Sequence, residues 1–283
     1  MQHFITGFEK QALVAATLGA GIGIGGAYAT AKKEMEVSKL KEQTITPSKN
    51  LKEFISKLKP GDVLYSGTRW GSTPEVSTYK RLGVKALPML GGDLKYHSMV
   101  YTGNGKVIDA DRRQDGSKLP DIAEVSLASK FKGVGRKDLA ITAYSPAGVD
   151  NYDRAKAVES VRSLVGARYP TDGEMFVKAL KVLSGVPGKK SAITKDDPVV
   201  CQDVAVKAHP DKFPKRHLTV TEMQYNPMFD PVARVGDLRH SPKDQVIADE
   251  LYPALKALRA GGKGFLTGMV ADALGSAYKN RSK

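Results

Sequence analysis

The stretch YHSMVYTGNGKVIDA, residues Tyr96–Ala110, decides how the rest of the chain is interpreted. Apolar residues alternate on both sides of a Gly-Asn-Gly group, a pattern that predicts two short strands joined by a tight turn. The stretch also carries His97 near its start and Asp109 near its end. Polar residues on a hairpin usually face water, so two titratable groups here need a reason.

The register of this hairpin determines whether His97 and Asp109 meet. If the loop consists of Thr102, Gly103 and Asn104, the two side chains lie opposite each other on one face. A two-residue loop would place Asp109 on the other face, because a one-residue shift turns every side chain over. The expectation that they interact therefore requires the longer loop.

Cys201 is the only cysteine, which excludes an internal disulfide framework and a thiolate zinc cluster. The segment KDDPVVCQDVAVKAHP, residues 195–210, predicts a short helix with Cys201 near its start. A helix N-terminus stabilises a thiolate, as does a nearby imidazolium. Cys201 is therefore either a nucleophile or a buried packing residue, since free cysteines are among the most buried residues.

A nucleophilic cysteine needs a histidine that takes its proton and a third polar group that orients the imidazole. The sequence has five histidines: His3, His97, His209, His217 and His240. His97 lies on a predicted strand, which gives a general base a rigid placement. We therefore expect Cys201, His97 and Asp109 to form the catalytic site.

The composition is that of a globular protein, with 283 residues, 41% of them hydrophobic and 26% charged. The formal net charge of +14 favours an anionic partner: nucleic acid, lipid head groups or a cell-wall polymer. The sequence shows no zinc-finger spacing, no Walker loop and no strand rich in base-stacking aromatic residues. We expect no specific nucleic-acid partner, no metal and no organic cofactor.

The N-terminal part has no charged residue from Gln11 to Ala31. Residues 12–31 are long enough as a helix to cross a bilayer, although glycine and alanine make them only weakly hydrophobic. Glycines spaced four apart, such as Gly19 and Gly23, suit close helix packing in a membrane. The alternatives are a secretion signal, with AYA as cleavage site, and a helix buried against another subunit.

Four segments are expected along the chain. Residues 1–33 form the apolar N-terminal segment, residues 34–50 a polar helical stalk or linker, residues 51–240 the main domain and residues 241–283 a helical tail. Within the main domain, helical spacing of apolar residues begins at Leu51 and again at Asn151. Strands are predicted over residues 62–65 and 138–146, and residues 67–95 read as a loop-rich insertion.

Four motifs in this order resemble the NlpC-type cysteine peptidases in their circularly permuted, YiiX-like form. They are LKPGDVLY, HSMVYTGNGKVIDA, GARYP and CQDVAV. The resemblance covers residues 52–209 and implies an α+β, papain-like fold with an antiparallel sheet packed on helices. It also implies that Cys201 is the nucleophile, His97 the base and Asp109 the third polar residue. The backbone N–H of Cys201 would belong to the oxyanion hole.

The sequence departs from the family at Met99 and Gln202, where the family usually has a small residue and a serine. Three residues are expected near the substrate. Tyr169 matches a family tyrosine, although a tyrosine after an amphipathic helix is more often in the core. Gln202 follows the cysteine. Trp70, the only tryptophan, lies in the insertion and contacts substrate or anchors the loop.

These observations predict a cysteine hydrolase that cleaves a peptide-stem amide of peptidoglycan, located at the cell envelope or in a virion. Peptidoglycan or another anionic envelope polymer is the expected partner, with membrane contact through residues 12–31. One alternative is a lipid acyl hydrolase or acyltransferase that uses the same residues. Another is a catalytically silent structural protein of a bacteriophage virion that assembles through its terminal segments.

Overall fold

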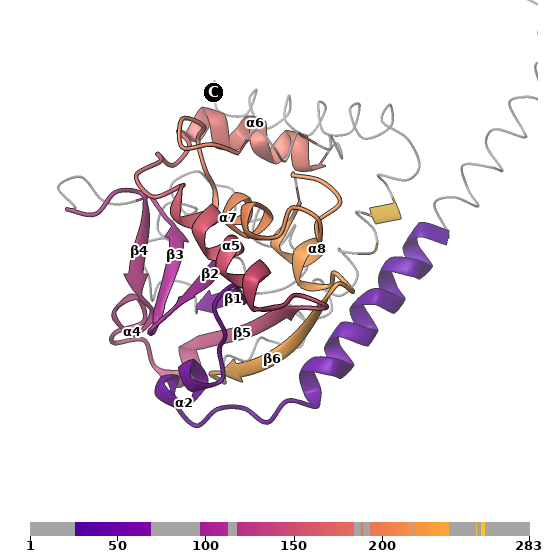
Figure 1. The fold of residues 1–283 in the computed structure, drawn as a ribbon. Helices are drawn as coiled ribbons and strands as arrows, with labels where there is room; N and C mark the ends of the chain where they lie inside the picture. Colours follow the sequence, from indigo (N-terminus) through magenta and orange to yellow (C-terminus); the bar gives the residue numbers. More distant parts are fainter. Residues whose placement is uncertain are drawn as a thin grey trace, which may run out of the picture.

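The sheet organises the structure, a computed structural model that describes residues 26–68, 97–112, 118–183, 188, 193–216, 218–237, 253, 256 and 257. Six strands pair in the order β4-β3-β2-β1-β5-β6, and every pairing is antiparallel (Figure 1). The strands are β1 (Val63–Thr68), β2 (His97–Gly103), β3 (Lys106–Ala110), β4 (Ile122–Ser126), β5 (Leu139–Pro146) and β6 (Phe229–Val235). With its helices, this sheet confirms the predicted α+β class.

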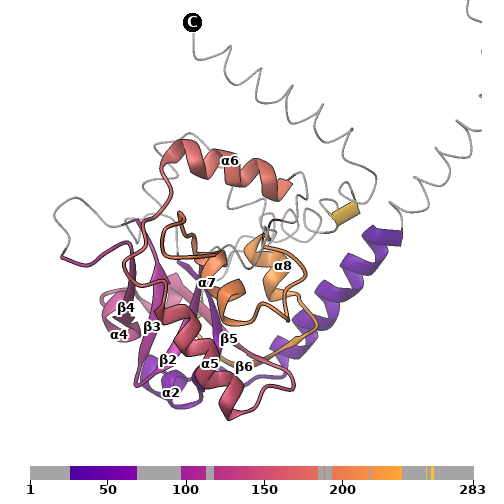
Figure 2. The same ribbon diagram turned by 45° about the horizontal axis from the view of Figure 1, so that its top comes forward.

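The helices cover both faces of the sheet. They are α2 (Leu51–Ser56), α4 (Leu127–Lys130), α5 (Asn151–Arg162), α6 (Asp172–Leu183), α7 (Cys201–Ala208) and α8 (Val220–Gln224), with a short 3₁₀ helix at Arg136–Asp138. Figures 1 and 2 show α5 and α7 against one face, with α6 farther from the sheet than α7. The predicted helices at Leu51, Asn151 and Cys201 and the strand over residues 138–146 are confirmed.

Alternation along the strands separates two cores, as the two-residue period of a strand requires. Val100 and Ile108 pack with Val204 of α7 on one face. Met99 and Val107 pack on the other face with Phe54 of α2. Cys201 is part of the first core.

The β2–β3 hairpin differs from the predicted one in its register. Its turn consists of two residues, Asn104 and Gly105, with φ angles of 51° and 70°. Asp109 pairs with Met99, so the expected direct pairing with His97 is wrong. A bulge between Tyr101 and Gly103 adds one residue to β2.

This bulge decides whether Asp109 lies on the same face of the hairpin as His97. Without it, a two-residue turn would place Asp109 on the face opposite to His97. With it, Asp109 shares a face with Met99 and therefore with His97, two residues earlier on β2. The two side chains are thus diagonal neighbours, a separation that polar side chains can bridge.

Residues 26–43 form a helix that leads into the domain. Gln224 Nε2 donates a hydrogen bond to Glu42 Oε1 at 2.8 Å, and Lys41 pairs with Asp230 of β6 at 2.7 Å. The segment expected to be a helical stalk or linker therefore contacts the sheet and α8. No helix among the described residues is long and apolar enough to span a membrane, and residues 12–25 of the predicted membrane segment lie outside them.

Candidate active site

Cys201 is the first residue of α7, so it lies at the N-terminal end of this helix. The first N–H groups of a helix have no intrahelical acceptor, and together they favour negative charge there. The residue is buried, with 5% of its surface exposed. Its thiol donates a hydrogen bond to Gln202 Oε1 at 3.2 Å. The predicted substrate residue Gln202 therefore contacts the sulfur itself.

His97 and Asp109 form a short hydrogen bond, with Nε2 and Oδ1 2.6 Å apart. Asp109 is completely buried and His97 is nearly so. Because Asp109 occupies Nε2, Nδ1 is the ring nitrogen that remains to exchange a proton with a nucleophile. The structure thus brings together two of the three residues predicted for the site.

Lys130 is a member of this cluster that the sequence did not reveal. Its Nζ lies 2.8 Å from Asp109 Oδ2 and 3.4 Å from Asp111 Oδ2. Lys130 belongs to none of the recognised motifs, and a lysine in a basic chain gives no local signal. Burial would raise the pKa of Asp109, but the charges of Lys130 and His97 and their hydrogen bonds hold it far below its usual range.

Electrostatics connects His97 to Cys201. Burial and the charge of Lys130 lower the pKa of His97, but Asp109 and the Cys201 thiolate outweigh them, so this pKa lies well above its ordinary value. Between the described residues, no hydrogen bond joins Sγ to the imidazole. By strand alternation, His97 and Asp109 lie on the face of Met99, whereas Cys201 belongs to the core on the face of Val100.

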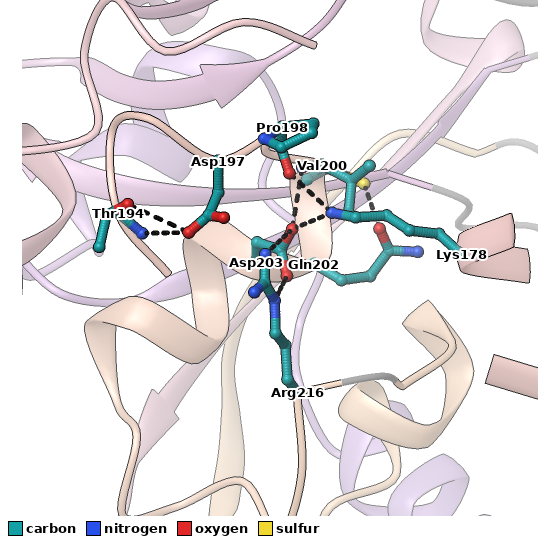
Figure 3. A network of polar contacts seen from close by, with 9 residues as sticks. Lys178, Thr194, Asp197, Pro198, Val200, Gln202, Asp203 and Arg216 are labelled. Carbon is teal, nitrogen blue, oxygen red and sulfur yellow. Dashed lines mark hydrogen bonds and ion pairs between the residues drawn. The ribbon is translucent and has the colours of Figure 1, made fainter. Parts of the chain in front are cut away.

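A buried ionic network fixes the segment that leads into Cys201 (Figure 3). Asp203 Oδ2 accepts from the backbone N–H of Val200 at 3.2 Å, and the same carboxylate pairs with Lys178 at 2.5 Å and Arg216 at 2.9 Å. Lys178 also donates to the Pro198 carbonyl at 2.8 Å. Val200 has no side-chain oxygen to cap α7, so Asp203 supplies the cap from within the first turn.

Two buried hydroxyls lie beside this site on paired positions of β1 and β2. Tyr65 and Ser98 pair across the strands, and within the described part of the chain neither Tyr65 OH nor Ser98 Oγ has a hydrogen-bond partner. Burial raises the pKa of Tyr65 strongly, and the Cys201 thiolate raises it further. These two strand positions therefore hold hydroxyl groups without a partner among the described residues, and a buried polar group left unpaired costs stability.

Tyr169 and Trp70 are the other two residues predicted to lie near the substrate. Tyr169 is partly buried against the core that contains Cys201, with the Arg112 guanidinium 5.9 Å from its ring centre. Its backbone N–H donates to Asp121 Oδ2 at 2.8 Å. Trp70 lies outside the described residues. Among the described side chains, no cluster of three or more His, Cys, Asp or Glu could hold a metal ion.

Comparisons of the chain with models of protein families, with curated proteins and with solved structures gave no match. A functional inference for this chain therefore depends on the chemistry of the site and on the motif resemblance.

Proposed function

We propose that the protein is a cysteine hydrolase with a permuted papain-like domain, which cleaves peptide-stem amide bonds of peptidoglycan. The observation that carries the proposal is the His97–Asp109 pair at 2.6 Å, on a sheet packed by a helix whose first residue is Cys201. The order along the chain, with histidine before cysteine, supports the permuted form. The net charge of +14 supports an anionic polymer as substrate.

The residues have distinct roles in the proposed reaction. The Cys201 thiolate attacks the carbonyl carbon of the amide, and the backbone N–H of Cys201 donates to the oxyanion that forms. The His97 imidazolium then gives its proton to the nitrogen as the C–N bond breaks, which leaves a thioester on Cys201 and releases an amine.

Water completes the cycle. Neutral His97 takes a proton from a water molecule, which attacks the thioester and releases a carboxylic acid and the Cys201 thiolate. Asp109 accepts the hydrogen bond from His97 Nε2 throughout, so it fixes the tautomer and stabilises the imidazolium. No step needs a group beyond the chain, the substrate and water.

The test is to incubate purified peptidoglycan sacculi with the wild-type protein and to identify released fragments by mass spectrometry. We expect new amine and carboxylate termini from the wild type and none from Cys201→Ala or His97→Ala. His217→Ala is the control and should stay active. Release that survives in Cys201→Ala would contradict the proposal.

The same protein preparation tests the alternative that the sequence left open, lipid acyl chemistry through the same thioester. If the protein releases acyl chains from phospholipid vesicles but leaves sacculi intact, the proposed amidase activity is wrong and the protein is a lipid acyl hydrolase. A folded wild type that cleaves neither substrate and whose Cys201 resists alkylation would favour a structural role.

A further inference from the structure

The Asp109 carboxylate is held from two sides. Oδ1 lies 2.6 Å from His97 Nε2, and Oδ2 lies 2.8 Å from Lys130 Nζ. Asp109 has no exposed surface, and only 9% of the Lys130 side chain is exposed. A buried ion pair at this distance is expensive to form and is strongly coupled once formed, because little solvent screens it.

The position of Lys130 is fixed by helix α4 and its buried neighbours. It is the last residue of α4, a short helix that follows β4. Leu127, at the start of α4, is fully buried, and its N–H donates to the Gly105 carbonyl in the β2–β3 turn at 2.9 Å. Phe131, directly after Lys130, is also buried. The ammonium group is therefore anchored to the same hairpin that carries His97 and Asp109.

The charge of Lys130 matters because two carboxylates lie here. Asp111 Oδ2 is 3.4 Å from the same Nζ, so Lys130 lies between Asp109 and Asp111. Among the described residues, the charged groups that act on His97 are Lys130, Asp109 and the Cys201 thiolate, and Lys130 opposes the other two. Without this cation, the two carboxylates would stabilise the His97 imidazolium more strongly, so His97 would release its proton less readily.

We propose that Lys130 is a positioning residue of the catalytic site, which aims Asp109 at His97 and balances its charge so that the imidazolium can release its proton to the leaving amine. The role in catalysis rests on the proposed function. The electrostatic part does not, because it concerns the titration of His97 in the protein alone.

The first test follows the His97 imidazole by NMR as pH is raised, with its signal assigned from His97→Gln. Lys130→Gln retains a hydrogen-bonding side chain and removes the charge, so we expect the His97 midpoint to move to higher pH. Lys130→Arg retains the charge and should leave the midpoint near that of the wild type. Lys106→Gln, an exposed lysine on the strand of Asp109, is the matched control and should not move it.

The outcomes separate this inference from the proposed function. An unchanged midpoint in a folded Lys130→Gln protein would overturn the role of Lys130, whether or not sacculi are cleaved. A raised midpoint without any cleavage by the wild type would support the electrostatic role and remove the amidase. If Lys130→Gln does not fold, Lys130→Arg and the double variant Lys130→Gln/Asp111→Asn, which also removes a carboxylate, provide the comparison.

An active preparation adds a kinetic readout. We expect Lys130→Gln to lower kcat about tenfold with little change in KM, since it impairs proton transfer rather than binding. Lys130→Arg should recover most of the rate. A rise in KM at constant kcat would show that Lys130 acts on binding and would contradict the proposal.

Discussion

Both oxygens of the Asp109 carboxylate are engaged, Oδ1 by His97 and Oδ2 by Lys130. A carboxylate buried without such partners would take up a proton instead of staying charged. With them it remains ionised, as its strongly lowered pKa indicates. An ionised Asp109 is what the imidazole needs from its orienting partner, because it can only accept the hydrogen bond from Nε2.

Asp109→Asn tests this requirement. The amide is similar in shape but carries no charge and can present a donor to Nε2, which favours the wrong tautomer. We expect kcat for fragment release from sacculi to fall about 10²- to 10⁴-fold. Asp111→Asn, which touches the same lysine from a more exposed position, is the control and should lose little. Equal rates for the two variants would show that Asp109 does not orient His97.

Gln202 offers a second test at this scale, because its Oε1 lies 3.2 Å from the Cys201 sulfur. Gln202→Glu places a carboxylate beside the thiolate, so we expect alkylation of Cys201 by iodoacetamide to be about tenfold slower at neutral pH. Gln202→Met, which removes the amide without adding charge, is the control. Since Cys201 is the only cysteine, the label reports this site alone. An unchanged rate in Gln202→Glu would mean that the side chain turns away from the sulfur in solution.

At the scale of single elements, the hairpin turn positions His97 and Asp109, and the first turn of α7 positions Cys201. Asn104 and Gly105 both have positive φ, as a two-residue hairpin turn of this type requires. The bulge next to this turn restores His97 and Asp109 to one face. The ion pairs of Asp203 position Cys201, because they connect the start of α7 to Lys178 of α6 and to Arg216.

Gly105→Ala probes the turn. A Cβ at Gly105 would meet nothing closer than 4.0 Å, so the cost is conformational strain at φ 70° and not a clash. We expect the free energy of unfolding in urea to fall by about 1 to 2 kcal/mol. Gly173→Ala in α6, where a Cβ meets no atom within 4 Å and φ is not positive, should be neutral or stabilising. A loss of the same size at both glycines would argue against strain at the turn.

Asp203→Asn probes the start of α7. The variant leaves Lys178 and Arg216 without their buried counter-charge, so we expect a loss of about 3 to 5 kcal/mol in urea unfolding. Burial raises the pKa of Asp203, but Lys178 and Arg216 lower it more, so it lies below its ordinary value. Its stabilisation is therefore present above about pH 4 and is lost as pH falls through the lower, folded-state pKa. Glu174→Gln, in the exposed pair with Arg168, is the control and should cost much less stability than Asp203→Asn.

At the scale of the whole molecule, His209 joins parts of the chain that are distant in sequence. It follows α7, its Nε2 lies 2.7 Å from the Gly61 carbonyl before β1, and its ring packs edge-on against Phe229 of β6. The same region holds the buried pair of Asp62 and Arg154, 2.9 Å apart, which connects α5 to the start of β1. Polar contacts therefore connect both α7 and α5 to the segment that leads into β1.

We expect His209 to make the folded protein less stable at acidic pH. Burial lowers its pKa, although the hydrogen bond to Gly61 opposes this, so the folded state favours the neutral ring. The unfolded chain takes up the proton below about pH 6.5, so the free energy of unfolding should fall by up to about 1.4 kcal/mol per pH unit from there down to the lower, folded-state pKa. His97 has a raised pKa, so its stabilising contribution is fully present in that range and is lost only at higher pH.

The measurement is urea unfolding at several pH values for the wild type and for His209→Gln. We expect the variant to be less stable near neutral pH and its free energy of unfolding to fall less steeply as pH decreases below about 6.5. The parallel variant His97→Gln should keep the acid slope, because His97 is charged in both states there. Identical slopes in the wild type and His209→Gln would assign the loss of stability at acidic pH to other groups.

The sequence by itself determined the helices at Leu51, Asn151 and Cys201 and the β2–β3 hairpin, because hydrophobic period and turn residues are local signals. It also placed Cys201 at a helix start and selected His97 and Asp109 as partners. The exact register was wrong, because a bulge is decided by how the whole sheet packs and not by the turn residues alone.

Only the tertiary structure decided which residues complete the site. Lys130 and Asp109 are 21 positions apart, and Lys178 and Asp203 are 25 apart, so no motif links them. Each pair meets because sheet pairing and helix packing bring separate elements together, and each persists because a buried carboxylate must find a cation. Local pattern thus gave these elements and the place of Cys201 at a helix start, whereas charge balance in the buried site depends on packing across the whole fold.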